Sequence, residues 1–355
     1  MAAPRILFLD EDHVLGLFRM VLENRDHEPS IKDWFAPELV DLEPLARAAT
    51  GLRTSEGAQV GSLAQQPPPD ADIIIFRRGV LTSRTLDENP SLRYVQRLGE
   101  RTEGIDLSAL RERGVRISCL PRRTLNFTAE HALLLMLALG KKLLPADAAV
   151  RQGPRALDGL APASGSVAYN WAGIAGATGL CGSTLGIVGL GEVGSLVARL
   201  ASAFGMKVLY HKPRRADPGR EAALGVAYVT LDELLARSDF VSLHAADIPE
   251  NRALAGEAFF RAMMPGACFV NTSRGRLVDE NALYRALAEG RLGGAGLDVH
   301  AAEPRAGGDR FAALPNVVLT PHLAGGARSG VLEEFKVMAQ NCLAATRGGE
   351  IQFEV

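Results

Sequence analysis

The segment Thr184-Leu-Gly-Ile-Val-Gly-Leu-Gly-Glu-Val-Gly194 is the most informative part of this sequence. It starts with a short apolar run that predicts a buried strand, followed by glycines in the spacing G-x-G-x-x-G. Beyond the turn, apolar residues recur at the spacing of one helix face: Val193, Leu196, Val197, Leu200, Ala201 and Phe204. A strand, a glycine-rich turn and a helix in this order predict a dinucleotide-binding unit.

Each part of the turn has a physical task in that interpretation. Gly189 permits the tight turn, Gly191 lets the backbone approach a pyrophosphate, and Gly194 allows close packing of helix on strand. The helix N-terminus at Glu192 and Val193 presents free N–H groups to the phosphates. The alternative is a glycine turn with a structural role only.

The end of the next predicted strand, residues 207–210, indicates which dinucleotide is bound. An acidic residue about 20 positions after the turn would accept the adenine ribose hydroxyl of NAD. Here Lys212 stands 21 residues after Gly191, and Arg214 and Arg215 follow it. Cations at this point would pair with a 2′-phosphate, so we expect NADP rather than NAD. The alternative is that these are solvated loop charges.

Strand-like runs alternate with helical stretches along most of the chain, which predicts an α/β protein with parallel sheets. Residues 49–70 and 152–182 are rich in Gly, Pro or small residues and are expected to be irregular, the first as a surface loop. The predicted strands are residues 5–9, 73–76, 185–188, 207–210, 240–244, 268–271, 295–299 and 317–319.

The composition is that of a globular protein with two domains. The chain has 355 residues, 47% of them hydrophobic, and 39 Lys and Arg against 41 Asp and Glu give a net charge of −2. This balance argues against a nucleic-acid partner. The four cysteines are far apart and predict no metal site. The longest apolar stretch, residues 132–139, is shorter than the roughly 18 residues of a membrane span, so we expect a cytoplasmic protein without a membrane partner.

Several motifs together resemble the D-isomer-specific 2-hydroxyacid dehydrogenase family, and the resemblance extends over most of the chain. The basic strand end is similar to that of its NADP-using glyoxylate/hydroxypyruvate reductase branch. The motifs are Asn271-Thr-Ser-Arg-Gly-Arg-Leu-Val-Asp-Glu280, Gly296-Leu-Asp-Val299, Glu303-Pro304, Thr320-Pro-His322, Gly104-Ile-Asp106 and Ala129-Glu-His131.

The resemblance implies two Rossmann-like or flavodoxin-like parallel-sheet domains with the active site in the cleft between them. Residues 1–119 and 323–355 would form a discontinuous substrate-binding domain, and residues 120–322 the dinucleotide-binding domain. It also implies a homodimer.

Reduction of a 2-keto acid requires a group that holds the substrate carboxylate and a group that protonates the carbonyl oxygen. Arg274, after the predicted strand 268–271, offers a forked and permanently charged donor for the first task. The alternative is an arginine that pairs on the surface or caps a helix.

His322 is the expected general acid and base, because histidine titrates near neutrality and this one follows the predicted strand 317–319. His244 also ends a predicted strand and is its main rival, although the resemblance places it beside the cofactor. The remaining histidines are His13, His27, His131, His211 and His300.

Glu303 would pair with His322, orient its ring and favour the imidazolium. The alternative is an exposed loop carboxylate before Pro304. The resemblance implies that Asp298 lies near the nicotinamide carboxamide, and that Thr272 and Ser273 also line the cofactor.

The predicted substrate loop, residues 99–106, departs from the family pattern. Gly99 is kept as a contact for the substrate carboxylate, but Arg101 stands where the family has a second glycine. Its side chain could obstruct the site, select a more anionic substrate, or point into solvent. The loop after His244 also lacks the usual Pro and Thr.

We therefore expect an oxidoreductase that transfers a hydride between NAD(P)H and a small anionic 2-keto or D-2-hydroxy acid, similar to glyoxylate or hydroxypyruvate. The alternative is an NAD(P)H-sensing protein similar to the C-terminal-binding-protein corepressors, which resemble the same family.

Overall fold

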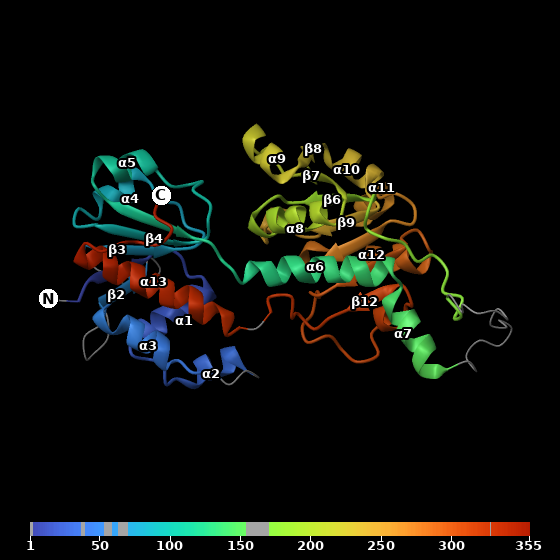
Figure 1. Cartoon of the computed structure of the whole chain (residues 1–355), viewed down its shortest axis with the longest axis horizontal. Helices are drawn as coiled ribbons and strands as arrows, with labels where there is room; N and C mark the ends of the chain where they lie inside the picture. The colour runs from blue at the N-terminus through green and yellow to red at the C-terminus, as the bar shows by residue number, and fades with distance from the viewer. Residues whose placement is uncertain (1–2, 37–39, 53–58, 63–69, 154–169, 327) are drawn as a thin grey trace. The chain divides into compact units, whose positions relative to one another are not determined.

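The structure is a computed structural model that describes residues 3–36, 40–52, 59–62, 70–153, 170–326 and 328–355. The chain divides into two compact units. Unit 1 comprises Met1–Thr124 and Gly326–Val355, and unit 2 comprises Leu125–Gly325. Most of the helices and strands of the two units are labelled in Figure 1.

Unit 1 contains a five-stranded parallel sheet in the order β2-β1-β3-β4-β5. The strands are β1 (Arg5–Phe8), β2 (Gln59–Ser62), β3 (Ile73–Phe76), β4 (Tyr94–Leu98) and β5 (Arg116–Leu120). Strands β1, β3, β4 and β5 are nearly all buried, as expected for a parallel sheet covered on both faces.

The helices of unit 1 bury apolar side chains in two clusters. One cluster joins α1, α3 and α13 with strands β1, β3 and β4, and the other joins α4 and α5 with the same sheet. The helices are α1 (His13–Leu22), α2 (Pro29–Phe35), α3 (Glu43–Ala49), α4 (Ser83–Asp87), α5 (Leu107–Glu112) and α13 (Gly330–Arg347), with a 3-10 turn at Thr50–Leu52.

Unit 2 contains a seven-stranded parallel sheet in the order β12-β11-β10-β9-β6-β7-β8. The chain runs outward from β6 through β7 to β8, then returns to β9 on the other side of β6, which makes a topological switch point between β6 and β9. The strands are β6 (Thr184–Val188), β7 (Lys207–His211), β8 (Val226–Tyr228), β9 (Phe240–Leu243), β10 (Cys268–Asn271), β11 (Gly294–Leu297) and β12 (Val317–Leu319).

Helices cover the sheet of unit 2 through two apolar clusters (Figure 1). Helices α6 and α8 contribute to one cluster, and α10, α11 and α12 to the other. The helices are α6 (Leu125–Gly140), α7 (Leu143–Gln152), α8 (Glu192–Ala203), α9 (Pro218–Leu224), α10 (Leu231–Arg237), α11 (Glu257–Ala262) and α12 (Glu280–Ala288), with 3-10 turns at Pro249–Asn251, Gly275–Leu277 and Arg310–Ala313.

The fold class predicted from the sequence is confirmed: both units are built on parallel sheets. Two local predictions were wrong. Residues 59–62, in the expected loop 49–70, form β2 beside β1. Phe204, expected on the buried face of α8, follows the end of that helix and is 44% exposed. Residues 154–169 of the second expected irregular stretch lie outside the described residues.

Within the described residues, none of the helices is both long and apolar enough to cross a lipid bilayer.

Candidate active site

The carboxyl edge of the unit 2 sheet gathers most of the predicted site residues. The glycine turn follows β6, and His244 follows β9. The predicted catalytic groups follow β10, β11 and β12. Because all seven strands are parallel, their carboxyl ends lie at one edge of the sheet, which is where open α/β sheets bind ligands.

The glycine turn packs so tightly at two of its glycines, Gly189 and Gly194, that larger residues would not fit there. Gly189 has a φ of 102°, and a Cβ atom there would lie 2.6 Å from the carbonyl oxygen of His244. A Cβ atom on Gly194 would lie 2.3 Å from the carbonyl oxygen of Gly189. These two glycines are therefore needed for the packing of the turn against α8 and the loop after β9.

Gly191 is a glycine for a different reason. A Cβ atom there would meet no atom of the structure within 4 Å, so protein packing does not require a glycine at this position. Gly191 is also the N-cap of α8, and among the described residues no side chain caps the N-terminus of that helix. Open space before an uncapped helix N-terminus fits the diphosphate of a dinucleotide.

Glu192 and Val193, in the first turn of α8, are half-buried at this opening.

His244 lies beside the turn and is held as a neutral imidazole. The backbone N–H of His244 donates to the carbonyl of Val188, and Nε2 of its ring lies 2.8 Å from the hydroxyl of Ser242. Surrounding protein atoms lower the pKa of His244 to about 4, although part of the residue remains exposed. A histidine that is uncharged near neutral pH is a poor proton donor for reduction, which favours His322 over this rival.

The basic segment after β7 is only partly available to a ligand. Arg215 donates two hydrogen bonds, of 2.8 and 2.7 Å, to the carboxylate of Glu221, and its guanidinium lies over the ring of Tyr228. These hydrogen bonds and one from Tyr210 lower the pKa of Glu221 to about 2. Arg214 is exposed and has no partner among the described residues, whereas Lys212 makes further contacts.

Sequence reasoning missed Arg220. This residue lies in α9, and its Nη2 is 3.0 Å from the hydroxyl of Ser195 in the first turn of α8. Its charge therefore lies close to the N-terminus that the glycine turn opens. No local motif marks it, because the contact joins residues 25 positions apart in the sequence.

Arg274 follows β10 and carries a guanidinium without a carboxylate partner among the described residues. Nη1 of Arg274 donates to the carbonyl of Ser273. The side-chain amide of Asn271 donates to the backbone carbonyl of Arg274. The hydroxyl of Ser273 donates to the carbonyl of Ala245, which joins the loops after β9 and β10. The buried hydroxyl of Thr272 has no hydrogen-bond partner in the described structure.

Glu303 and His322 come together as the sequence predicts. Nδ1 of His322 lies 2.6 Å from Oε2 of Glu303, and both side chains are partly exposed. Burial alone would raise the pKa of Glu303, but hydrogen bonds from His322 and from the N–H of His300 hold that pKa below its ordinary value. Glu303 is therefore an ionised partner for the imidazole at neutral pH.

His322 has a left-handed backbone conformation, with a φ of 54°. Such a conformation costs a residue with a side chain roughly 1–2 kcal/mol, so the surroundings must hold it in place. Asp298 does so: its carbonyl accepts the N–H of His322, and its fully buried carboxylate accepts the N–H groups of Leu323 and Ala324 and the hydroxyl of Thr320. The predicted contact of Asp298 with the nicotinamide remains a prediction.

The predicted substrate loop belongs to unit 1, after β4. The N–H of Gly99 already donates to the carbonyl of Leu120, at 2.8 Å. Arg101 is half-buried, and neither its N–H nor its guanidinium has a partner among the described residues. The backbone N–H and the guanidinium of Arg101 are therefore available to an anion.

Comparison with known proteins identifies the family. Residues 133–324 match the family model described as D-isomer specific 2-hydroxyacid dehydrogenase, NAD binding domain. The chain is 38% identical over 295 residues to a glyoxylate reductase of Korarchaeum cryptofilum, which covers 80% of this chain and 85% of that protein. The chain belongs to the D-isomer-specific 2-hydroxyacid dehydrogenase family. It is an NAD(P)-dependent 2-hydroxyacid dehydrogenase, so the enzyme interpretation of the sequence is confirmed.

Two further proteins are similar to this chain, one in sequence and one in structure. A D-3-phosphoglycerate dehydrogenase of Mycobacterium tuberculosis is 37% identical over 258 residues, which cover 72% of this chain and 45% of that protein. The crystal structure of apo D-mandelate dehydrogenase from Rhodotorula graminis matches with a TM-score of 0.61 at 26% identity, covering 100% of this chain and 98% of that one.

Proposed function

We propose that this dehydrogenase reduces a small 2-keto acid, similar to glyoxylate or hydroxypyruvate, to the D-2-hydroxy acid with NADPH. The observation that carries the proposal is the 2.6 Å hydrogen bond between Glu303 and His322 at the carboxyl edge of the NAD(P)-binding unit. The name of the 38% identical relative, a glyoxylate reductase, supports this substrate class.

His322 is the proposed proton donor. Its Nδ1 is directed to Glu303, which leaves Nε2, without a partner among the described residues, to protonate the carbonyl oxygen. The ionised carboxylate of Glu303 accepts from Nδ1 and orients the ring of His322. In the oxidative direction the same nitrogen accepts the proton.

Arg274 is the proposed anchor for the substrate carboxylate. A guanidinium without a carboxylate of its own can bind the substrate carboxylate through two parallel hydrogen bonds. The same group polarises the carbonyl as negative charge develops on its oxygen. A reduced nicotinamide supplies the hydride when the cofactor is bound.

The proposed cofactor contacts line the switch point of the unit 2 sheet. The diphosphate would be held by Gly189, Gly191, Gly194 and the N–H groups of Glu192 and Val193. The nicotinamide end would be bordered by His244, Thr272, Ser273 and Asp298. The preference for NADP rests on Arg214 and Lys212, with Arg220 as a further cation near the first turn of α8.

Unit 1 is the proposed substrate-binding domain, and the free donors of Arg101 support this role. They favour a substrate with a second anionic group, such as a phosphorylated or dicarboxylic 2-keto acid, as a second candidate class. We keep Gly99 as a proposed contact, although its N–H is already bonded within the sheet.

We also propose that the protein forms a homodimer through unit 2 and that it is cytoplasmic. Helix α7 buries none of its side chains, and exposed apolar residues gather on α6 and α7. They are Phe127, Leu134, Leu143, Leu144 and Val150. A surface of this kind fits a second copy of the chain. The four cysteines are free thiols, which fits a reducing compartment.

A spectrophotometric screen of 2-keto acids with NADPH and with NADH tests the proposal. We expect the highest kcat/KM with NADPH and with a small or doubly anionic 2-keto acid. A higher kcat/KM with NADH would contradict the cofactor preference. Turnover only with bulky hydrophobic 2-keto acids would contradict the substrate class.

A further inference from the structure

One imidazole, that of His300, joins the two loops that carry Glu303 and His322. Its Nε2 lies 2.9 Å from the carbonyl oxygen of Thr320, two residues before His322. Its Nδ1 lies 3.2 Å from Nε of Arg305, two residues after Glu303. His300 is only 8% exposed, so water does not readily replace these contacts.

The two partners of His300 require the same tautomer. A guanidinium can only donate, so Nδ1 of His300 must accept, and a carbonyl oxygen can only accept, so Nε2 must carry the hydrogen. Nε2 of His300 therefore donates to the carbonyl of Thr320, in the loop that carries His322. On the other side of the ring, Nε of Arg305 donates to Nδ1. His300 thus links the loop after β11 to the loop after β12. We call this link, made by His300 with Arg305 and Thr320, the clip.

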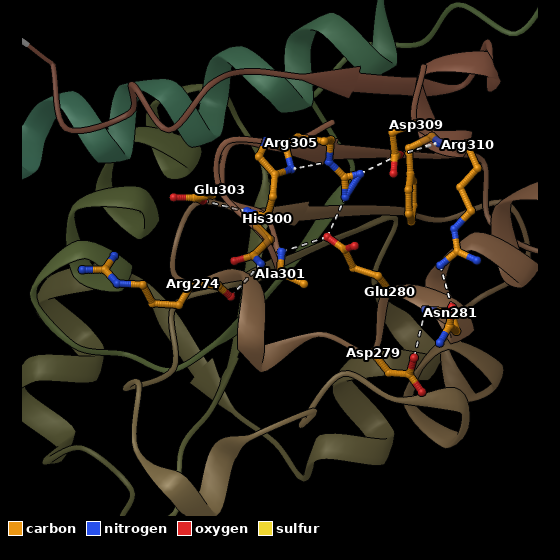
Figure 2. Close-up of polar contacts among 12 residues, drawn as sticks. Arg274, Asp279, Glu280, Asn281, His300, Ala301, Glu303, Arg305, Asp309 and Arg310 are labelled. Carbon is orange, nitrogen blue, oxygen red and sulfur yellow. Dashed lines mark hydrogen bonds and ion pairs between the residues drawn. The ribbon is translucent and has the colours of Figure 1, made fainter. Parts of the chain in front are cut away.

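Arg305 is itself held on several sides. Its Nη2 donates to Glu280 at 2.6 Å, its Nη1 donates to Asp309 at 2.7 Å, and its guanidinium lies 4.9 Å from the ring centre of Phe311. Figure 2 shows Arg305 between His300 and Glu280, and a dashed line joins Glu303 to His300. The planar guanidinium uses all three nitrogens at once, which lysine could not do.

This network determines which oxygen of Glu303 is available to His322. Oε1 of Glu303 accepts a hydrogen bond of 2.9 Å from the backbone N–H of His300, which leaves Oε2 for Nδ1 of His322. The N–H of Ala301 donates to the same Glu280 oxygen that binds Arg305, so the turn is held at both ends. A shift of His300 would move the Glu303 carboxylate away from the imidazole.

We infer that His300 and Arg305 are positioning residues that hold the Glu303–His322 pair in its reactive geometry. They do so by clipping together the two loops that carry this pair. The inference rests on the proposed acid–base role of His322. The charged groups around the clip are Glu280, Asp309 and Glu303. The buried Asp298 accepts from the hydroxyl of Thr320, and its Oδ1 lies 3.5 Å from Nε2 of His131.

The chain offers a matched control in Arg310. This arginine also lies over the ring of Phe311, at 5.6 Å, and over Tyr284 at 4.7 Å, and it donates to the side chain of Asn281. It belongs to the same segment as Arg305 but makes no contact with His300. Loss of Arg310 removes a similar packing contact and leaves the clip intact.

The test compares His300→Phe, Arg305→Met and Arg310→Met in the full-length enzyme. The measurements are kcat, KM, the pH profile of kcat/KM, NADPH affinity and Tm. We expect His300→Phe and Arg305→Met to lower kcat roughly 10- to 100-fold, because misplacement of a catalytic group by about 1 Å has effects of this size. The pH at which reduction fails should also move downward, because the imidazolium loses its oriented carboxylate.

Arg310→Met should keep the kcat and the pH profile of the wild type, and all three variants should bind NADPH normally. His300→Gln, which keeps a donor for the Thr320 carbonyl, should recover part of the lost kcat. This variant also serves if His300→Phe fails to fold.

The inference is overturned if His300→Phe and Arg305→Met lower Tm but keep the kcat and the pH profile of the wild type. It is also overturned if Arg310→Met lowers kcat as much as they do. His322→Gln separates this failure from failure of the proposed function. If His322→Gln is inactive while His300→Phe is fully active, only the positioning role is wrong. If His322→Gln keeps full turnover, the acid–base assignment itself is wrong.

Discussion

Nδ1 of His322 and Oε2 of Glu303 lie 2.6 Å apart although 19 residues separate them in the sequence. One side chain comes from the loop after β11 and the other from the loop after β12, and these strands are neighbours in the sheet. The adjacency of two parallel strands therefore brings a carboxylate and an imidazole together. The pairing leaves Nε2 of His322 as the nitrogen that we propose for proton transfer.

His322→Gln removes this nitrogen and should lower kcat by about 10²- to 10⁴-fold, which is the usual contribution of a general acid or base. Affinity for NADPH should stay close to that of the wild type, because His322 follows β12 and the glycine turn follows β6. Steady-state kinetics and a fluorescence titration with NADPH measure the two effects. Turnover at the wild-type rate would show that another group transfers the proton.

Glu303→Gln keeps the shape of the side chain and removes its charge. We expect the pH above which reductase activity is lost to move downward, because a neutral amide stabilises the imidazolium less than a carboxylate does. The pH profile of kcat/KM checks this prediction. An unchanged profile would mean that the carboxylate does not influence the reacting proton.

The stability of the Glu303→Gln variant gives an independent check with a defined sign. The pKa of Glu303 is lowered in the folded protein, so its ionised form stabilises the fold above the ordinary glutamate pKa of 4.5. This stabilisation is lost as the pH falls through the lowered value. The wild type should therefore lose more unfolding free energy than the variant when the pH is lowered below 4.5.

The sequence was sufficient to predict what depends on local patterns. The glycine turn, the strand before it and the helix after it are encoded in adjacent residues, and the structure contains them. Glu303 and His322 were also paired correctly. Their positions after two strands of a predicted parallel sheet indicated that they would share one edge.

The sequence was not sufficient where distant residues compete for the same group. Arg215 is predicted from the sequence to contact the cofactor, and the sequence gives no sign that Glu221 from α9 binds its guanidinium. His300 was treated as one of several ordinary histidines, and only the fold shows that it bridges Arg305 and Thr320. Strand β2 was missed because residues 59–62 lie in a Gly-, Gln- and Pro-rich segment, and pairing with β1 outweighs the local propensity.

His244→Gln should change the dependence of stability on pH. The pKa of His244 is lowered from 6.5 to about 4, so the folded state excludes a proton that the unfolded chain binds below pH 6.5. The wild type should therefore lose unfolding free energy progressively between pH 6.5 and 4, and the variant should lose less. Urea unfolding across this range measures the difference, and equal slopes for the two proteins would contradict a neutral imidazole in the folded state.

Arg101→Gly restores the residue that the family pattern has at this position. If the free donors of Arg101 bind a second anionic group, the variant should lose about tenfold or more in kcat/KM for phosphorylated or dicarboxylic 2-keto acids. Its kcat/KM for glyoxylate should change little or rise. An equal loss for both classes would indicate that Arg101 binds the carboxylate common to all of them.

Arg214→Ala and Arg215→Ala are matched changes that separate two adjacent cations after β7. Arg214 has no partner among the described residues, so its charge is available to the 2′-phosphate of NADPH. Arg215 is bound by Glu221 through two hydrogen bonds and lies over Tyr228, so its charge is largely compensated. Arg214→Ala should raise the KM for NADPH roughly 10- to 100-fold, as expected for a charged hydrogen bond worth about 1.5–3 kcal/mol, and leave the KM for NADH unchanged. Arg215→Ala should raise the KM for NADPH less and lower Tm more. Equal losses with NADPH and NADH in the Arg214 variant would show that the arginine contacts a part common to both cofactors.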